Sequence, residues 1–268
     1  MIQRLTPLLA TSLLALGINV AHAAPVLTVG IEATYPPMSY RNPTTNESTG
    51  FNIDLFKVLA KQMNVELKFQ EMSFEQLTTG LATGRIDVIG TAITDLPTRR
   101  SNMTFVDYLQ TGAQMFTTAS NAAGGVTPEA FCGKAIGSPR TTNYFIELNA
   151  WSAKTCVAAG KPAADIQGAA GAAAVRLDLK QGRLNAAVLG PEYVKYLMSE
   201  EPGAYVLVGE PLSVHYFGFA VAKGKDEVRD QLVKGLQASL ADGSYQHVLE
   251  QWHLQSQGIK QVTVDGGQ

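Results

Sequence analysis

The sequence has few charges and no long basic stretch. Charged residues make up 16% of its 268 residues, and 21 Lys and Arg against 23 Asp and Glu leave a formal net charge of −2 at pH 7. No run of Lys or Arg could follow a phosphate backbone, and no basic amphipathic stretch could lie on anionic lipid. Nucleic acid and membrane surfaces are therefore not expected as partners. With 46% apolar residues, the chain can bury a core in one large domain or in two smaller ones.

Long apolar runs are missing after the N-terminal leader. Residues 1–4 form a short positive region that contains Arg4, residues 5–20 are mostly apolar, and Ala21-His22-Ala23 is a small-x-small cleavage site. This pattern predicts a signal peptide over residues 1–23 and a mature chain in the periplasm. An uncleaved membrane anchor is the alternative. Pro7, Gly17 and an apolar run below the ~20 residues that span a bilayer disfavour it.

Cysteine is scarce as well, with only Cys132 and Cys156, so no cysteine near the cleavage site could carry a lipid. Because exported thiols meet an oxidising compartment, a disulfide between these two is favoured over two buried thiols. A closed loop of 25 residues would stabilise the fold by about 3 kcal/mol through the unfolded state. We assign this bond a structural role.

Strand and helix patterns alternate in the first part of the chain. Short β-rich runs predict strands over residues 26–30, 65–69 and 86–89. Asn52 can cap the first intervening helix, and Ser73 with Gln76 forms a capping box for a second helix that ends near Gly84. This βαβαβ unit predicts a mostly parallel sheet with helices on both faces.

A second unit of the same kind follows, with strands expected over residues 135–137 and 185–189 and helices over 143–153 and 170–180. Residues 84–90 (GRIDVIG) are echoed by residues 182–190 (GRLNAAVLG), which favours two similar lobes, although such a phrase can recur by chance. Strands over 205–208 and 216–221 and helices over 226–241 and 244–252 complete the α/β pattern. The linker of small residues at 117–125 is the predicted first crossing between lobes.

The loops that follow the strands are the candidate site, because ligands of open α/β sheets bind beyond the carboxyl ends of the strands. One loop, residues 90–100, carries the hydroxyl of Thr94 and the guanidinium of Arg99. A planar two-pronged cation beside free backbone N–H groups suits a small carboxylate. The alternative is that Arg99 and Arg100 are solvated surface charges.

Several motifs occur in an order that resembles a known family. They are Tyr35-Pro36-Pro37-Met38, the stretch from Gly50 to Leu55, Gly84 to Val88, Ala92 to Arg99, Phe105 to Tyr108, Asp242 to Tyr245, and Gln251-Trp252. Together they resemble the polar-amino-acid cluster of bacterial extracellular solute-binding proteins (family 3), the periplasmic components of ABC importers. The resemblance spans nearly the whole mature chain.

The resemblance implies a two-lobed α/β fold, the type II periplasmic-binding-protein fold, with a mostly parallel βαβ-type sheet in each lobe and two crossing strands as a hinge. Lobe 1 is expected to comprise residues 24–117 and 212–268, and lobe 2 residues 118–211. The resemblance implies that Arg99 binds an α-carboxylate with help from Thr94 and the backbone near Ala92. It further implies Tyr35 as a cover over the ligand and Glu32 as a partner for a cationic side chain. The remaining implied ligand contacts are Phe51, from the motif Gly50 to Leu55, and the second-lobe pair Thr141 and Thr142.

The chain departs from the family pattern at two places. Gly190 stands where an aspartate usually pairs with the α-ammonium, so another acid substitutes or the ligand lacks that ammonium. Glu192 is the nearest substitute, although it also suits an ordinary first helical turn. The glycine expected before Thr141 is missing, and Arg140 lies there instead. If the Arg140 side chain points into the cleft, two cations favour an anionic ligand; if it points outward, it is a surface residue. The charge of the ligand's side chain stays open.

We expect a monomeric, non-catalytic binding protein that captures a small polar carboxylate, such as an amino acid, for an ABC permease, with no cofactor and no metal. One alternative is a dehydratase-like enzyme acting on a prephenate-like acid, another a binder of a non-amino-acid organic acid, and a third a partner of a membrane sensor. His215 could reach the cleft, but a core or hinge role suits it better. The spacing of His247 and His253 does not put two metal ligands on one helical face.

Overall fold

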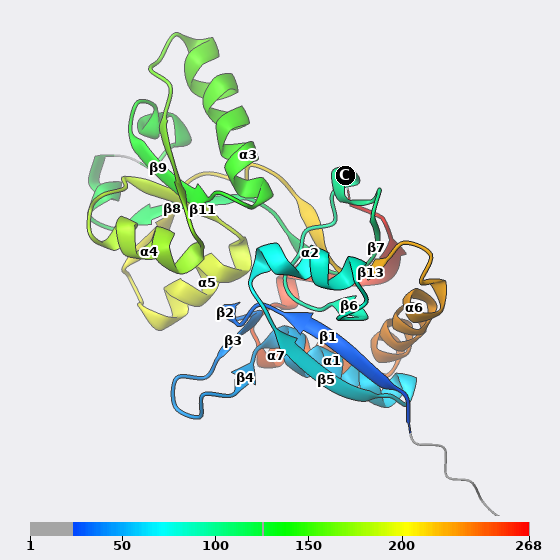
Figure 1. The fold of residues 1–268 in the computed structure, drawn as a ribbon. Coiled ribbons are helices and arrows are strands. Elements are labelled where there is room, and N and C mark those ends of the chain that lie inside the picture. The colour runs from blue at the N-terminus through cyan, green and yellow to red at the C-terminus, as the bar shows by residue number, and fades with distance from the viewer. Residues whose placement is uncertain (1–23, 125, 268) are drawn as a thin grey trace, which may run out of the picture.

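The computed structural model describes residues 24–124 and 126–267, so the predicted signal peptide lies outside the described residues. Two sheets, each flanked by helices, form two lobes joined by two chain crossings (Figure 1). In the described part of the chain, no helix is long and apolar enough to cross a membrane. The two-lobed α/β architecture predicted from the sequence is confirmed.

The first lobe contains a six-stranded sheet in the order β14-β7-β13-β6-β1-β5. Its predicted βαβαβ unit consists of β1 (Val26–Ile31), α1 (Phe51–Met63), β5 (Glu66–Glu71), α2 (Phe74–Ala82) and β6 (Val88–Ile89). β1 pairs in parallel with both β5 and β6. The Ser73 and Gln76 capping box is present at the start of α2, whereas α1 begins one residue before its predicted cap, with Gly50 at the N-cap.

Antiparallel strands complete this sheet: β7 (Met103–Thr111), β13 (His215–Ala222) and β14 (Gly258–Val264). The helices α6 (Asp226–Ala241) and α7 (Ser244–Gln251) pack on α1. An aromatic stack lies in the core of the lobe, where the ring centroids of Tyr108 and Phe219 are 4.1 Å apart. A small hairpin sheet of β2 (Thr34–Tyr35), β3 (Ser39–Arg41) and β4 (Ser48–Thr49) lies between β1 and α1 in the chain.

The second lobe contains a five-stranded sheet in the order β10-β9-β11-β8-β12. Its strands are β8 (Gln114–Thr118), β9 (Ala135–Pro139), β10 (Asp165–Ala169), β11 (Ala186–Leu189) and β12 (Tyr205–Leu207). The helices are α3 (Asn143–Trp151), α4 (Ala172–Lys180) and α5 (Pro191–Glu200). After α3 the chain continues as a π-helical turn (Ser152–Cys156), so the predicted helix over 143–153 ends in a different geometry.

The chain passes from the first sheet to the second at Gly112 and Ala113, earlier than the predicted 117–125 linker. β8 already belongs to the second sheet, and the small residues of that linker follow it in a 3-10 turn (Asn121–Gly124). The return crossing lies between β12 and β13. The two crossings touch: a Cβ at Gly112 would lie 2.0 Å from the Ser213 carbonyl oxygen, so glycine is required there.

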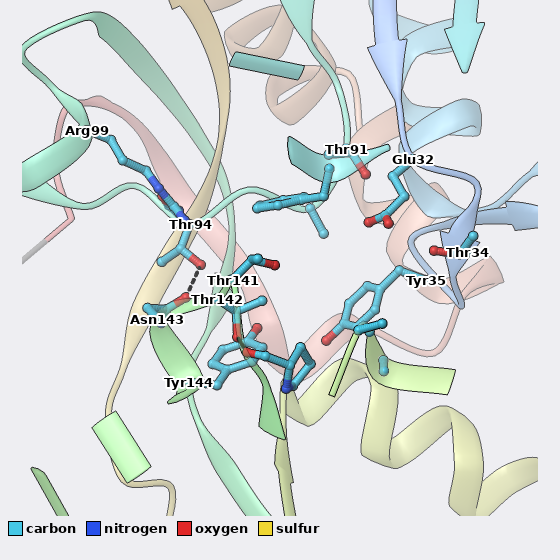
Figure 2. Close-up of a pocket in the computed structure, with 16 residues that line it drawn as sticks. Glu32, Thr34, Tyr35, Thr91, Thr94, Arg99, Thr141, Thr142, Asn143 and Tyr144 are labelled. Atoms are coloured by element: carbon cyan, nitrogen blue, oxygen red, sulfur yellow. Dashed lines mark hydrogen bonds between the residues drawn. The ribbon is translucent and has the colours of Figure 1, made fainter. Parts of the chain in front are cut away.

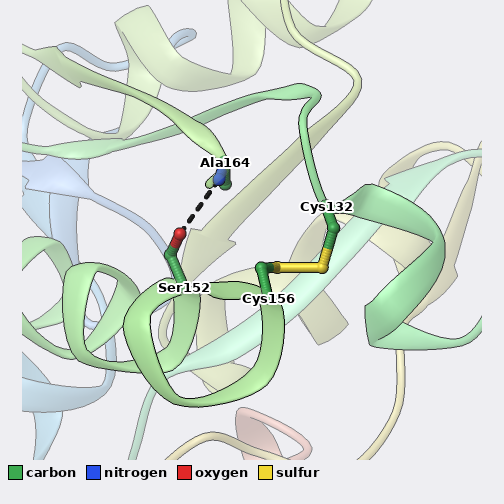
Figure 3. The surroundings of a disulfide bond; sticks show 4 residues. All are labelled: Cys132, Ser152, Cys156 and Ala164. Carbon is green, nitrogen blue, oxygen red and sulfur yellow. Dashed lines mark hydrogen bonds between the residues drawn. A yellow bond between two sulfur atoms is a disulfide. The ribbon is translucent and has the colours of Figure 1, made fainter. Parts of the chain in front are cut away.

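The predicted disulfide between Cys132 and Cys156 is formed, with an S–S distance of 1.99 Å and the Cα atoms 5.5 Å apart (Figure 3). It joins the segment that enters β9 to the π-helical turn after α3. Beside it, the backbone N–H of Ala164 donates to the Ser152 hydroxyl oxygen at 2.9 Å. The bond therefore fastens the outer end of the second lobe, away from the crossings.

Candidate ligand-binding site

A cavity lies between the two lobes, where the carboxyl ends of strands from both sheets face one another (Figure 2). The space among the lining side chains is about 650 Å³ when the solvent at its open mouth is included. The first lobe lines it with Glu32, Thr34, Tyr35, Phe74, Thr91, Ala92, Thr94 and Arg99, and the second with Pro139, Thr141, Thr142, Asn143, Tyr144, Ala170, Gly171 and Ala172.

Arg99 supplies the cation of the cavity. It ends the 3-10 turn Pro97–Arg99, and its Nη1 donates to the Thr94 carbonyl oxygen at 2.7 Å. The guanidinium carbon lies 6.0 Å from the centre of the Phe74 ring, within reach of a cation–π contact. Burial lowers the pKa of Arg99, yet an arginine stays protonated at neutral pH. Among the ion pairs of the described residues none involves Arg99, so its charge is available to an anion.

The neighbouring Arg100 has a different role. Its Nε and Nη2 donate to the two carboxylate oxygens of Asp95, both at 2.8 Å, and Asp95 is fully buried. Two parallel hydrogen bonds of this kind fix the orientation of the guanidinium plane relative to the carboxylate plane. The adjacent arginines are therefore not two solvated surface charges: one holds the loop together and the other faces the cavity.

Thr94 and Tyr35 of the first lobe form hydrogen bonds with residues of the second lobe. The Thr94 hydroxyl donates to Asn143 Oδ1 at 3.1 Å, and Asn143 begins α3 in the second lobe (Figure 2). The Tyr35 hydroxyl donates to Glu192 Oε1 at 2.8 Å and accepts from the Gly190 N–H at 3.2 Å. Both contacts join residues of opposite lobes, so they hold the cleft closed around the cavity.

Glu32 is the acid that lines the cavity. It follows β1, and burial raises the pKa of its carboxyl while a hydrogen bond with Thr34 lowers it. In Figure 2 its carboxylate and the Arg99 guanidinium lie on opposite sides of the cavity. Such an arrangement can hold a ligand that is negative at one end and positive at the other.

Glu192 lies behind Tyr35 and does not line this cavity. It is fully buried and accepts hydrogen bonds from Tyr35, from the Thr111 hydroxyl at 3.0 Å and from Gln257 Nε2 at 3.3 Å. Burial raises the pKa of its carboxyl. A Cβ at Gly190 would lie 1.8 Å from Glu192 Oε1, so this carboxylate fills the space that a side chain at position 190 would need.

Seven of the predicted contact residues line the cavity: Glu32, Tyr35, Ala92, Thr94, Arg99, Thr141 and Thr142. Phe51 does not, because it is fully buried in the first-lobe core and stacks on Tyr108 with centroids 6.2 Å apart. Arg140 does not either, because it is exposed and donates to the Gly168 carbonyl oxygen at 2.8 Å. The outward orientation of Arg140 is the one that the structure shows.

Sequence reasoning missed several lining residues. Asn143 and Tyr144 begin α3 directly after the predicted threonine pair, so the capping position of Thr142 was the available signal. Gly171 and its neighbours follow β10, a strand that was not predicted because its sequence (DIQGA) has little apolar character. Phe74 follows the Ser73 cap, where an aromatic at the first helical position gave no sign of its direction.

His215 lies at the second crossing, as one of the two interpretations predicted. Its Nε2 is 2.8 Å from Glu147 Oε1, and Asn143 Nδ2 donates to the same oxygen at 2.8 Å. Burial acts to raise the pKa of Glu147, but the hydrogen bonds from His215, Ser213 and Asn143 lower it below its ordinary value. Glu147 thus links the crossing to Asn143 at the cavity. No group of His, Cys, Asp and Glu in residues 24–124 and 126–267 could hold a metal ion.

The family model of bacterial extracellular solute-binding proteins, family 3, matches residues 27–255. The chain belongs to this family. This solute-binding protein is 26% identical to the arginine-binding protein ArgT of Corynebacterium glutamicum, over 86% of the chain and 75% of that relative. It is 28% identical to the L-cystine-binding protein TcyA of Bacillus subtilis, over 85% of the chain and 81% of that relative.

Among solved structures, the solute-binding protein is similar to an ancestral arginine-binding protein bound to arginine. The TM-score is 0.73 at 27% identity, and the match covers 86% of this chain and 99% of that one. The match extends over both lobes, in agreement with the two sheets and two crossings described above.

Proposed function

We propose that the protein binds an amino acid in the cavity between its lobes without changing it chemically. The observation that carries this proposal is Arg99, a partly buried cation with no acid paired to it among residues 24–124 and 126–267, facing a cavity lined by both lobes. Its guanidinium would bind the α-carboxylate in two-pronged fashion, beside the Thr94 hydroxyl. The binding of arginine and cystine by relatives supports an amino acid as the ligand.

In this proposal, Glu32 pairs with a positively charged side chain of the ligand. It is the lining acid on the far side of the cavity from Arg99, whereas Glu192 is covered by Tyr35 and already accepts from three donors. The missing aspartate at position 190 is therefore not replaced by a carboxylate that reaches the cavity. The role of Glu192 is to hold Tyr35 as a cover.

A carboxylate ligand without an α-ammonium is a second candidate. Gly190 favours it, because an ammonium near that position would meet no lining acid of the second lobe. An ion buried without a partner costs several kcal/mol, enough to remove useful affinity. The two candidates differ in whether the amine of the ligand adds to affinity or subtracts from it.

We further propose that the leader is cleaved after Ala23 and that the mature monomer works in the periplasm, delivering its ligand to an ABC permease. Closure follows ligand binding because the ligand contacts both lobes and so binds the closed state more tightly than the open one. Family membership supports this place in transport.

A thermal-shift series of the ligand-free mature protein tests the proposal. The series contains arginine, histidine, cystine and glutamine, each beside its des-amino hydroxy acid where one exists. A ligand at 100 times its Kd stabilises the folded state by about 2.7 kcal/mol, which gives a shift of several degrees. Shifts with amino acids alone support the first candidate and shifts with des-amino acids alone support the second. The absence of any shift would contradict both.

A further inference from the structure

The chain continues past the region that matches the family model. This continuation contacts residues 90–100, the loop after β6, here called the ligand loop. The match ends at residue 255, whereas β14 (Gly258–Val264) adds a strand to the edge of the first sheet by pairing with β7. Residues 265–267, here called the C-terminal clamp, then run along the loop that follows β6 (Figure 1). That loop carries Thr94 and Arg99.

The C-terminal clamp bonds to both members of the ion pair that closes the ligand loop. The N–H of Gly267 donates to Asp95 Oδ2 at 2.7 Å, and Arg100 Nη2 donates to the carbonyl oxygen of Gly267. A single residue thus bridges the carboxylate and the guanidinium of the Asp95–Arg100 pair. Asp95 directly follows Thr94, and Arg100 directly follows Arg99, so both ends of the ligand-facing segment are fixed from behind.

Further bonds anchor the C-terminal clamp to the sheet. Asp265 Oδ1 accepts from the Phe105 N–H at 2.8 Å, and the Gly266 N–H donates to Asp107 Oδ2 at 3.0 Å. The fit is close: a Cβ at Gly267 would lie 2.3 Å from the Asp95 carbonyl oxygen, and backbone atoms cannot yield as a flexible side chain can. Only glycine fits at position 267 without movement of the loop.

We propose that the C-terminal clamp positions Arg99, holding its loop in the conformation that receives the ligand's carboxylate. This inference rests on the proposed function of Arg99. If the loop is already ordered before the ligand binds, binding does not have to pay the entropy cost of ordering it. Loss of the C-terminal clamp therefore weakens affinity, although no residue of the clamp lines the cavity. Without the C-terminal clamp, the buried Asp95 carboxylate would lose the Gly267 N–H as a hydrogen-bond donor. The loop would then move so that this carboxylate reaches solvent.

The test compares Gly267→Ala and the milder Asp265→Ala with Lys223→Ala. Lys223 is a matched control, because its exposed ammonium contacts Asp265 at 3.9 Å but does not touch the ligand loop. Backbone hydrogen exchange is measured on the ligand-free proteins, and Kd by calorimetry with the amino acid that gives the largest thermal shift. We expect Gly267→Ala to speed exchange in residues 94–100 at least tenfold, to leave exchange in β9 and α3 unchanged and to raise Kd about tenfold or more.

Unchanged exchange in residues 94–100, or faster exchange spread evenly over both lobes, would overturn the C-terminal clamp as a positioning segment. An unchanged Kd despite faster exchange would overturn it too. Failure of the proposed function looks different, because the wild-type protein would then bind no ligand of the series. The exchange data on ligand-free protein would still decide whether the clamp orders the loop.

Discussion

Two adjacent arginines with the same chemistry have different tasks because their surroundings differ. Arg100 is paired with buried Asp95, and Arg99 donates to the Thr94 carbonyl and otherwise faces the cavity. Position 140 offers a third arginine, which is exposed and directed away from the cavity. Arg99 is therefore the one guanidinium that the described residues place at the cavity.

Replacement of Arg99 by lysine is expected to weaken ligand binding about tenfold or more. An ammonium keeps the charge but not the two-pronged geometry, and hydrogen bonds to charged groups contribute about 1.5–3 kcal/mol. Calorimetric Kd values for Arg99→Lys and for the control Arg140→Ala provide the check. Equal weakening in the two variants would contradict the placement of the carboxylate on Arg99.

Glu32 and Glu192 are expected to differ in their effect on ligands with a cationic side chain. Glu32→Gln should weaken binding of arginine while leaving binding of the neutral glutamine within a few-fold, because the lost charge lies across the cavity from Arg99, where the side chain of the ligand would lie. Glu192→Gln should not change the ratio of the two affinities, since Tyr35 lies between it and the cavity. A ratio that shifts with Glu192→Gln and not with Glu32→Gln would reverse the assignment.

Asp107 should make stability depend on pH. Burial first, and the nearby Asp95 carboxylate next, raise the pKa of Asp107 to about 7 from an ordinary 3.8, although Thr263 and Gly266 donate to it. Arg100 and Asp265 also lie in this cluster. The folded state therefore binds a proton that the unfolded state releases between about pH 4 and 7, so this contribution to stability is full below pH 4 and is lost as pH rises to 7.

The measurement is the difference in Tm between wild type and Asp107→Asn across pH 4 to 8. The wild type should lose stability relative to the variant as pH rises through this window, and the difference should level off above pH 7. A difference that stays constant over the whole window would show that Asp107 keeps one protonation state in it.

At the scale of elements, periodic patterns predicted every helix except α5 but only half of the strands, of which the buried apolar runs of β1, β6 and β11 are distinctive. The strands that were not predicted are β2, β3, β4, β7, β8, β10 and β14. Two of the differences from the prediction arise from tertiary contacts. β10 pairs with β9 through its backbone despite a polar sequence, and the first crossing is set by the contact of Gly112 with Ser213, which lies far away in the sequence.

The position of the candidate site could be predicted because ligand-binding residues lie in the loops that follow the strands. Arg99 and Thr94 follow β6, and Thr141 and Thr142 follow β9, so strand order alone brought them together. Phe51 also lies near a strand end, but its side chain turns inward onto Tyr108. The direction of a side chain depends on packing that no local pattern contains, and this also applies to Glu192.

The disulfide is an element-scale feature whose loss should lower stability and leave binding intact. The double variant Cys132→Ser, Cys156→Ser is expected to lose about 3 kcal/mol of unfolding free energy, since a loop with a sequence separation of 24 is no longer closed in the unfolded state. Denaturant unfolding measures the loss. A Kd that rose in parallel would contradict the view that this bond fastens the outer end of the second lobe only.

The whole molecule has the form of a closed trap, with two crossings on one side and interlobe hydrogen bonds at the cavity. Thr94 with Asn143 and Tyr35 with Glu192 join the lobes, and Glu147 connects Asn143 to His215 at the crossing. A chain of hydrogen-bonded side chains thus connects the cavity with the second crossing. In the proposed function, ligand capture and closure would be one coupled event.

The measurement that tests the central claim most directly is calorimetric titration of the ligand-free mature protein with the amino acid that gives the largest thermal shift, followed by mass spectrometry of the ligand. We predict saturable binding of one molecule per chain, recovery of the ligand unchanged, and loss of binding in Arg99→Ala. Chemical conversion of the ligand, or binding that survives in Arg99→Ala, would contradict the account.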